Sequence, residues 1–198
     1  MRRNPVVTLF AALCLVVSMH SARAASGSVV SVSGSVTAGG RALKLGDGVE
    51  VSDTVNVPAG GKLKLRMADG SIISVAPGTQ MTVAAYSVDG SGQRRDAKLS
   101  LTQGLVRAAV APGQPSTFEV ATAVGTASVR GTDWFIDAEG GSAQVGVLSG
   151  TVDLTSAATR RTVSIPAHWG ARLEAGRDPV QPRVWSQAEF DAFIQRTQ

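Results

Sequence analysis

Few residues in this chain are of the types that carry out chemistry, and their spacing argues against a catalytic site. His168 is the one imidazole after residue 24, and no Gly-x-Ser-x-Gly segment offers it a serine nucleophile. Asp133 and Asp137 form the best carboxylate pair, because strand periodicity would put both on one face. Four residue steps of about 3.3 Å place their Cβ atoms about 13 Å apart, which exceeds both glycosidase spacings. We therefore expect a protein that is not an enzyme.

Metal and phosphate sites of the common kinds are not indicated either. Cys14 and His20 fall in the first 24 residues, so a chain cleaved there has no cysteine for a disulfide, a zinc site or a thiol nucleophile. The segment Asp69–Ile73 lacks the alternating acids of a calcium loop. Gly60–Leu63 lacks the upstream glycine and the hydroxyl of a phosphate-binding loop. We expect no cofactor and no metal.

The first 24 residues are typical of a secretory signal peptide. Arg2 and Arg3 precede an apolar run of about 12 residues, and Ala22-Arg23-Ala24 matches the small-x-small cleavage pattern. Cleavage is expected between Ala24 and Ala25. A spanning helix needs about 20 apolar residues, so a retained anchor is the weaker alternative and no membrane span is expected after cleavage.

The basic composition belongs mostly to this signal. The chain has 19 Lys plus Arg and 15 Asp plus Glu, but three of the arginines and none of the acids precede Ala25, which leaves a mature balance of +1. The pairs Arg94-Arg95 and Arg160-Arg161 lie next to turn-like residues with few aromatics nearby. We interpret both pairs as solvated turns, and expect no nucleic-acid partner.

The rest of the chain predicts an all-β fold. Apolar and polar residues alternate in short runs from Ser28 to Leu173, the pattern of half-buried strands. Asp-Gly pairs at 47–48, 69–70 and 89–90 separate such runs, and their glycines would supply the positive φ of tight turns. Three Gly-x-Val triplets, beginning at Gly34, Gly104 and Gly150, suggest equivalent corners of a twisted β-solenoid-like or stacked β-sheet domain.

The C-terminal segment changes character. Residues 25–178 are assigned to the β domain and residues 179–198 to a proline-containing linker and a short helix. Ser186 and Glu189 form a capping box, and Trp185 with Phe190 forms a hydrophobic staple. The apolar face of this helix, which ends near Gln195, either packs on the β domain or is presented to a partner protein.

The order of several motifs resembles the FecR-like domain, and the resemblance extends from about Val29 to Ala175. The matching residues are Gly34-x-Val36, Leu43–Asp47, Asp69–Ser71, Pro77-Gly78, Leu101-x-x-Gly104-x-Val106, Phe118-x-Val120-x-Thr122, Ala127-x-Val129-Arg130-Gly131-Thr132 and Val147-x-x-Gly150-x-Val152. The resemblance implies a twisted, solenoid-like β fold that works by protein contact. One departure is Trp134, which occupies a position where the family usually has Phe.

The segment around Val129–Phe135 should have one face buried in the core and one face exposed to solvent. Gly131 suits a bend where no side chain fits, Thr132 can bond a neighbouring backbone, and Trp134 should fill the core with Ile136. Alternation would then leave Asp133, Phe135 and Asp137 on the opposite, exposed face, as a candidate contact for a partner.

The signal peptide indicates a stand-alone exported module, and the resemblance implies that it binds a protein in the bacterial periplasm or envelope, in a signalling role linked to iron or siderophore uptake. Full FecR regulators also have a cytoplasmic sigma-factor-binding segment and a membrane helix, whereas only a signal peptide precedes the β region here. The alternative is a module that binds cell-wall glycan through Tyr86, Trp169 and Trp185. A hydrolase would require several acids to converge on one cleft near His168.

Overall fold

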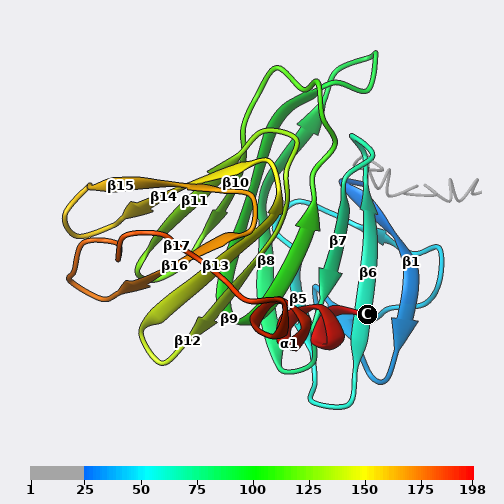
Figure 1. Cartoon of the computed structure of the whole chain (residues 1–198). Coiled ribbons are helices and arrows are strands. Elements are labelled where there is room, and N and C mark those ends of the chain that lie inside the picture. The colour runs from blue at the N-terminus through cyan, green and yellow to red at the C-terminus, as the bar shows by residue number, and fades with distance from the viewer. Residues whose placement is uncertain (1–24) are drawn as a thin grey trace, which may run out of the picture.

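Two stacked β-sheets and a C-terminal helix make up the protein (Figure 1). A computed structural model describes residues 25–198, so the expected signal peptide, with Cys14, His20 and Ala24, lies outside the described part. No helix among residues 25–198 is long and apolar enough to cross a bilayer. The expectation of a mostly β fold with one short terminal helix is confirmed, whereas the solenoid form is not.

The first sheet, sheet A, has nine strands in the order β4-β1-β6-β7-β9-β12-β13-β16-β17. Its strands are β1 (Gly27–Ser33), β4 (Gly48–Val49), β6 (Lys62–Met67), β7 (Ile72–Val75), β9 (Arg94–Ala109), β12 (Asp133–Glu139), β13 (Ser142–Ser149), β16 (Trp169–Glu174) and β17 (Arg183–Val184). All of its pairings are antiparallel.

The second sheet, sheet B, runs in the order β3-β2-β5-β8-β9-β10-β11-β14-β15. It adds β2 (Thr37–Ala38), β3 (Arg41–Ala42), β5 (Thr54–Val57), β8 (Thr79–Val88), β10 (Phe118–Ala121), β11 (Gly125–Val129), β14 (Thr151–Ser156) and β15 (Thr162–Pro166). The long strand β9 belongs to both sheets, and its parallel pairing with β10 is the one exception to an antiparallel pattern.

Alternating side chains of the two sheets meet in one hydrophobic core. In β6, Leu63, Leu65 and Met67 are buried while the intervening Lys62, Lys64 and Arg66 face outward. Val55 and Leu99 of sheet B lie in the same cluster as Leu65. Burial of such apolar area is the main term that stabilises the fold.

The Gly-x-Val triplets mark the points where the chain passes from one sheet to the other. Gly34 lies between β1 and β2, Gly104 lies where β9 leaves sheet B for sheet A, and Gly150 joins β13 to β14; their φ angles are 72°, 91° and 86°. These are the equivalent corners expected from the repeat. The positive φ explains the glycine, since other residues rarely adopt it.

Two of these corners also share a threonine; the backbone bond of Thr132 was expected from the sequence, whereas the matching role of Thr79 was not. Thr79 lies against Gly104 and Thr132 lies against Gly150, and each threonine follows a glycine of positive φ. The Thr79 hydroxyl donates to the Leu105 carbonyl (3.3 Å), and the Thr132 hydroxyl donates to the Thr151 carbonyl (3.1 Å). In both corners the accepting residue directly follows the glycine.

Gly104→Ala should therefore be costly. A Cβ there would lie 2.6 Å from the Thr79 Cα, and the backbone would hold alanine at a φ of 91°. We expect a loss of about 2–4 kcal/mol in the free energy of unfolding, measured by urea denaturation. Gly140→Ala is the matched control, because Gly140 has a φ of 57° and no atom near its Cβ position. It should lose only about 1 kcal/mol, and an equal loss at both sites would contradict the close-packed corner.

The Asp-Gly turns are present, but only one uses its own glycine for the positive φ. Gly70 has a φ of 86°, as expected, whereas in the other two turns the positive φ lies at Gly46 (87°) and Gly92 (80°). In the third turn the Asp89 carboxylate accepts the N–H groups of Ser91 and Gln93. These bonds close a longer turn, in which the positive φ lies at Gly92 and not at Gly90.

Candidate functional site

Strand β12 has the two faces that alternation predicts. Trp134 and Ile136 are buried in the main core, and Asp133, Phe135 and Asp137 point to the other side of sheet A. The expectation that Phe135 would be exposed on that face is wrong, because only 1% of its surface is accessible. The C-terminal helix α1 (Gln187–Thr197) covers it.

Phe135 lies at the centre of an aromatic cluster between sheet A and α1. Its ring stacks on Phe193 with centroids 4.4 Å apart, and it lies 5.8 Å from Trp185 and 6.0 Å from Phe190. Ala76 and Leu105 of the sheet complete the buried cluster. Of the two alternatives for the apolar helix face, packing on the β domain is therefore the one observed.

Two glycines shape the sheet surface under Trp185. Gly146 and Gly170 are cross-strand neighbours on β13 and β16, and Gly146 is also paired with Phe135. A Cβ on Gly170 would lie 2.0 Å from Trp185 Cε2, and one on Gly146 would lie 2.8 Å from Trp185 Cζ3. The indole thus packs directly against the backbone at Gly146 and Gly170. Gly146 interrupts an alternating strand between Val145 and Val147, which is the sequence signal that could have indicated a close approach.

The two carboxylates beside Phe135 are each held by an arginine. Arg107 donates from Nε and Nη2 to the two Asp133 oxygens, at 3.0 Å and 2.8 Å. This bidentate bond raises the pKa of the Arg107 guanidinium. Asp137 accepts from Arg196 of α1 at 2.7 Å, so an ion pair ties the end of the helix to β12.

The start of α1 has the predicted cap. Ser186 is the N-cap, its hydroxyl accepts from the Glu189 N–H, and the Glu189 carboxylate accepts from the Ser186 N–H at 2.8 Å. Arg183 also donates to Glu189, at 2.5 Å. The bonds from Arg183 and then from the Ser186 backbone lower the pKa of Glu189 to about 2. The Trp185–Phe190 staple is present as well, with ring centroids 5.5 Å apart.

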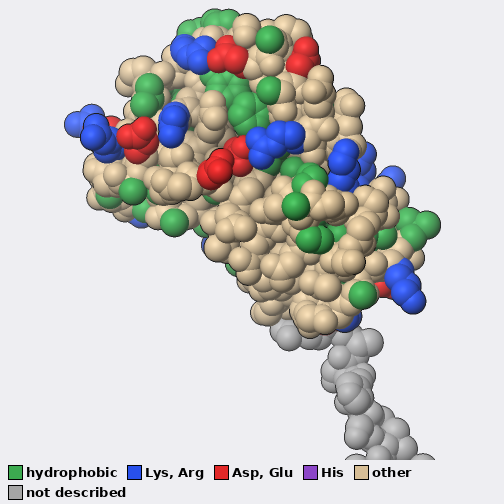
Figure 2. All heavy atoms as spheres, turned by 90° about the horizontal axis from the view of Figure 1, so that it is seen from below, with side chains coloured by type: hydrophobic (Ala, Val, Ile, Leu, Met, Phe, Trp, Pro, Cys, Tyr) green, Lys and Arg blue, Asp and Glu red, His purple; other side chains and the backbone are tan. Residues whose placement is uncertain are grey.

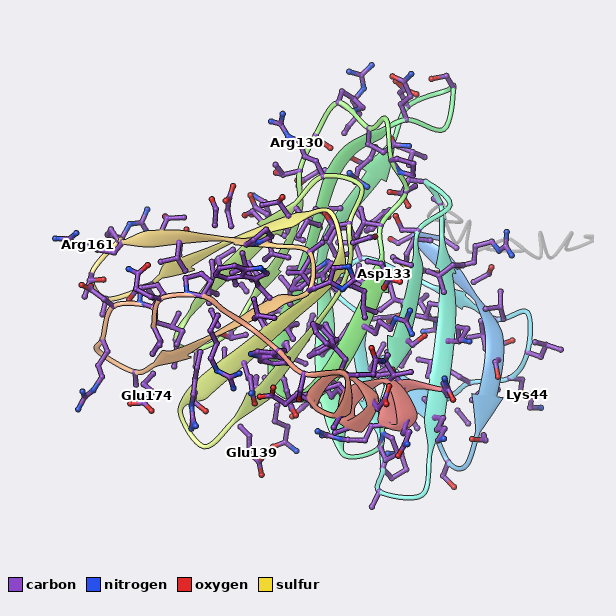
Figure 3. All side chains as sticks on the ribbon, viewed as in Figure 1. Lys44, Arg130, Asp133, Glu139, Arg161 and Glu174 are labelled. Atoms are coloured by element: carbon purple, nitrogen blue, oxygen red, sulfur yellow. The ribbon has the colours of Figure 1, made fainter. Side chains whose placement is uncertain are left out.

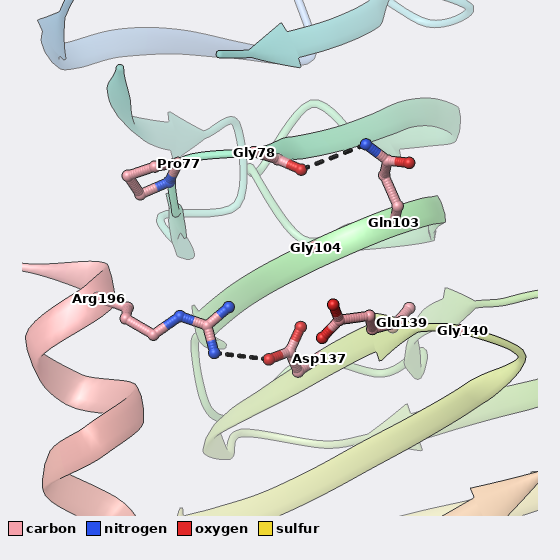
Figure 4. Close-up of a pocket in the computed structure, with 9 residues that line it drawn as sticks. Pro77, Gly78, Gln103, Gly104, Asp137, Glu139, Gly140 and Arg196 are labelled. Atoms are coloured by element: carbon pink, nitrogen blue, oxygen red, sulfur yellow. Dashed lines mark hydrogen bonds and ion pairs between the residues drawn. The ribbon is translucent and has the colours of Figure 1, made fainter. Parts of the chain in front are cut away.

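A shallow hollow of about 340 Å³ lies between the end of α1 and the corner of β9 (Figure 4). Asp137, Glu139 and Arg196 face it, with Pro77, Gly78 and Gln103 on the other side. His168 does not line this hollow but lies in an exposed turn before β16, with a φ of 67°. Within residues 25–198, no group of three or more His, Cys, Asp or Glu is placed to hold a metal.

The predicted family motif divides into buried and exposed parts. Val129 and Thr132 are buried, and a Cβ on Gly131 would lie 2.8 Å from the Pro112 Cα. Arg130 by contrast points away from the sheets into solvent (Figure 3). Trp134 is fully buried, and its indole Nε1 has no hydrogen-bond partner.

The interpretation of Arg94-Arg95 as a solvated turn is half wrong. Arg95 is exposed and pairs with Asp89, but the Arg94 side chain is fully buried and donates to Asp69 at 2.5 Å. Asp69 also accepts from the Tyr86 hydroxyl at 2.6 Å. No local pattern marks Arg94 as buried, since its partner lies 25 residues earlier in the chain. Arg160 and Arg161 both lie in an exposed turn, as expected, and Arg161 points into solvent (Figure 3).

The aromatic platform required by the glycan alternative is not on the surface. Tyr86 and Trp185 are buried, with 7% and 6% of their surface accessible, and Trp169 is half-buried against the main core. Charged groups on the face seen from below instead lie next to one another with mixed signs and some hydrophobic side chains between them (Figure 2). Tyr86, Trp169 and Trp185 therefore do not form the exposed stacking platform that a sugar ring would need.

One family model matches this chain, and two solved structures share its fold. The family model described as "FecR protein" matches residues 53–153. Two crystal structures of a candidate anti-sigma factor from Parabacteroides distasonis ATCC 8503, at 2.50 Å and 1.65 Å resolution, each align with a TM-score of 0.59 and 16% identity. The alignment covers 72% of this chain and 64% of that chain, so this chain spans just under two thirds of the solved protein. Such a likeness shows the fold alone. No curated protein gave a significant match.

Proposed function

Because the chain belongs to the FecR protein family, we propose that it is an exported, non-enzymatic module that binds a protein in the bacterial cell envelope as part of a signalling or regulatory pathway. The observation that carries the proposal is the family match over residues 53–153. The shared fold with a candidate anti-sigma factor is consistent with it.

The chemistry of the described surface supports a protein partner over a small substrate. The hollow beside Asp137 is open, polar and partly occupied by the Asp137–Arg196 ion pair, whereas small-molecule sites are mostly enclosed and apolar. Among the strands of residues 25–198, β15 pairs only with β14, which leaves its other edge free, and such edges are common sites of protein contact. Phe135 is not free for such contact while α1 covers it.

Affinity capture from a bacterial envelope extract tests the proposal. Purified protein fixed to a support should retain one protein reproducibly, and a β protein of similar size and charge serves as the control bait. Cosedimentation with purified peptidoglycan runs in parallel. Retention on peptidoglycan with no protein partner would overturn the proposal in favour of the glycan alternative.

The link to iron or siderophore uptake is a finer proposal that rests on the family name alone. It predicts that the captured protein is more abundant in envelopes from iron-starved cells than in those from iron-replete cells. Quantitative mass spectrometry of the two extracts measures this ratio. Equal abundance of the captured protein would contradict the iron link and leave protein binding intact.

A further inference from the structure

One strand of sheet A carries a line of three positively charged side chains. Lys62, Lys64 and Arg66 occupy alternate positions of β6, so all three point to the outer face of the sheet. We call these three residues the basic stripe. Neighbouring residues of the stripe are two positions apart, which is about 6.6 Å along the strand. This spacing is shorter than the Debye length of about 8 Å at physiological salt. The three like charges therefore repel one another.

The strands beside the stripe do not relieve this repulsion. The cross-strand neighbours on β1 are Ser33, Ser31 and Ser28, and those on β7 are Ser74 and Ile72. Neither Lys64 nor Arg66 pairs with a carboxylate of residues 25–198.

In sheet B, by contrast, an outward-facing lysine has an acidic cross-strand neighbour. Lys98 on β9 lies directly opposite Glu119 on β10, at 4.0 Å. Opposite charges at such positions stabilise a sheet. The stripe is thus a place where the usual cross-strand compensation is missing.

One residue of the stripe already binds an oxygen atom of this chain. Lys62 donates from Nζ to a main-chain oxygen of Gln198 at 2.8 Å, where the end of α1 reaches β6 (Figure 1). Lys62 is therefore occupied. Lys64 and Arg66 remain open to an anionic group further along the strand.

We propose that the basic stripe docks an extended, acidic segment of a partner protein, with carboxylates at alternate residues aligned on Lys64 and Arg66. Alternate side chains of an extended chain repeat at about 6.6 Å, the spacing of the stripe itself. The serines of β1 and Ser74 of β7 flank the cations and offer hydroxyl donors to the same carboxylates. This inference rests on the proposed function and names a surface and a partner chemistry for it.

Two other anionic partners fit the stripe less well. A membrane surface would require apolar side chains that insert beside the cations, but the exposed large hydrophobics of the described part are Leu45, Val180 and Val184, none of them on β1, β6 or β7. Single-stranded nucleic acid would require aromatic stacking platforms. The three strands contain no aromatic residue.

The test measures binding of a labelled Glu-Ser-Glu-Ser-Glu-Ser-Glu peptide by fluorescence anisotropy at low salt, with the Gln-Ser analogue as the neutral probe. The double variant Lys64→Glu/Arg66→Glu should bind the acidic peptide at least about tenfold more weakly. The matched control is Arg160→Glu/Arg161→Glu, which changes the net charge equally in an exposed turn and should change affinity less than twofold. Circular dichroism checks that both variants fold.

Several results would overturn the docking surface. These are equal weakening by both double variants, equal binding of the acidic and neutral peptides, or binding to phosphatidylglycerol vesicles without binding to the peptide. Capture of the same envelope protein by the wild type and by Lys64→Glu/Arg66→Glu would also reject the stripe while the proposed function stands. Capture of no protein by either form would instead reject the proposed function.

Discussion

Asp69→Ala should lower the free energy of unfolding by about 3–5 kcal/mol, because it leaves Arg94 charged and buried without its partner. Both side chains of the pair are fully inaccessible, and their contact is 2.5 Å long. The Tyr86 hydroxyl loses its acceptor at the same time. Urea denaturation measures the loss, and Asp89→Ala, in an exposed Asp-Gly turn with a similar arginine pair, is the control that should lose far less stability.

A second variant separates the effect of the buried charge on stability from the effect of side-chain packing. Asp69→Leu/Arg94→Met replaces both members of the pair by apolar side chains, and buried ion pairs replaced in this way often lose little stability. The double variant should therefore be more stable than Asp69→Ala. A double variant that is as unstable as the single one would show that the hydrogen bonds of Arg94 to the β9–β10 connection dominate, such as the bond to the Ser116 carbonyl (2.9 Å).

The Asp69–Arg94 pair should also make the free energy of unfolding decrease as the pH falls. Burial alone would raise the pKa of Asp69, but the bonds from Tyr86, Ser71 and Arg94 outweigh it and hold the pKa below its ordinary value. The folded pKa is lower than the unfolded value of about 3.9. Asp69 therefore contributes stability above about pH 4 that is lost as the pH falls. The wild type should lose more stability than the apolar double variant between pH 5 and pH 2.5.

The buried pair also shows why part of this structure was predictable and part was not. Period-two alternation is a local property, so it correctly placed Trp134 and Ile136 inside and Asp133 and Asp137 outside. The corners at Gly34, Gly104 and Gly150 follow from the same local reasoning. Burial of Arg94 does not, because it depends on where β9 lies relative to the Asp69 turn in three dimensions.

Phe135 shows the same limit on the other side of the sheet. Alternation placed it correctly on the face of Asp133 and Asp137, but a helix more than 50 residues later covers that face. The capping box and the apolar positions of α1 were each visible in the sequence. The aromatic residues of this segment reach Phe135 because Gly146 and Gly170 have no side chains that would block the sheet surface. That surface exists only once β13 and β16 are paired.

Phe135→Ala should accordingly cost about 3–4 kcal/mol in the free energy of unfolding. The substitution removes a ring that is 1% accessible and in contact with Trp185, Phe190 and Phe193, so a cavity would open under the helix. Leu45→Ala is the matched control, because Leu45 is 72% accessible. It should change stability by no more than about 0.5 kcal/mol.

Hydrogen exchange of α1 distinguishes a docked helix from an independent one. If Phe135 holds α1 on sheet A, Phe135→Ala should speed exchange of the α1 amides more than that of β8 or β9, because the helix loses its main contact while the core between the sheets stays intact. An isolated helix of 11 residues is marginal in water, so undocking and unfolding of α1 should coincide. Unchanged exchange in α1, with a stability loss as small as that of Leu45→Ala, would mean that Phe135 is free after all. The Asp133–Phe135–Asp137 face would then return as a contact site for a partner.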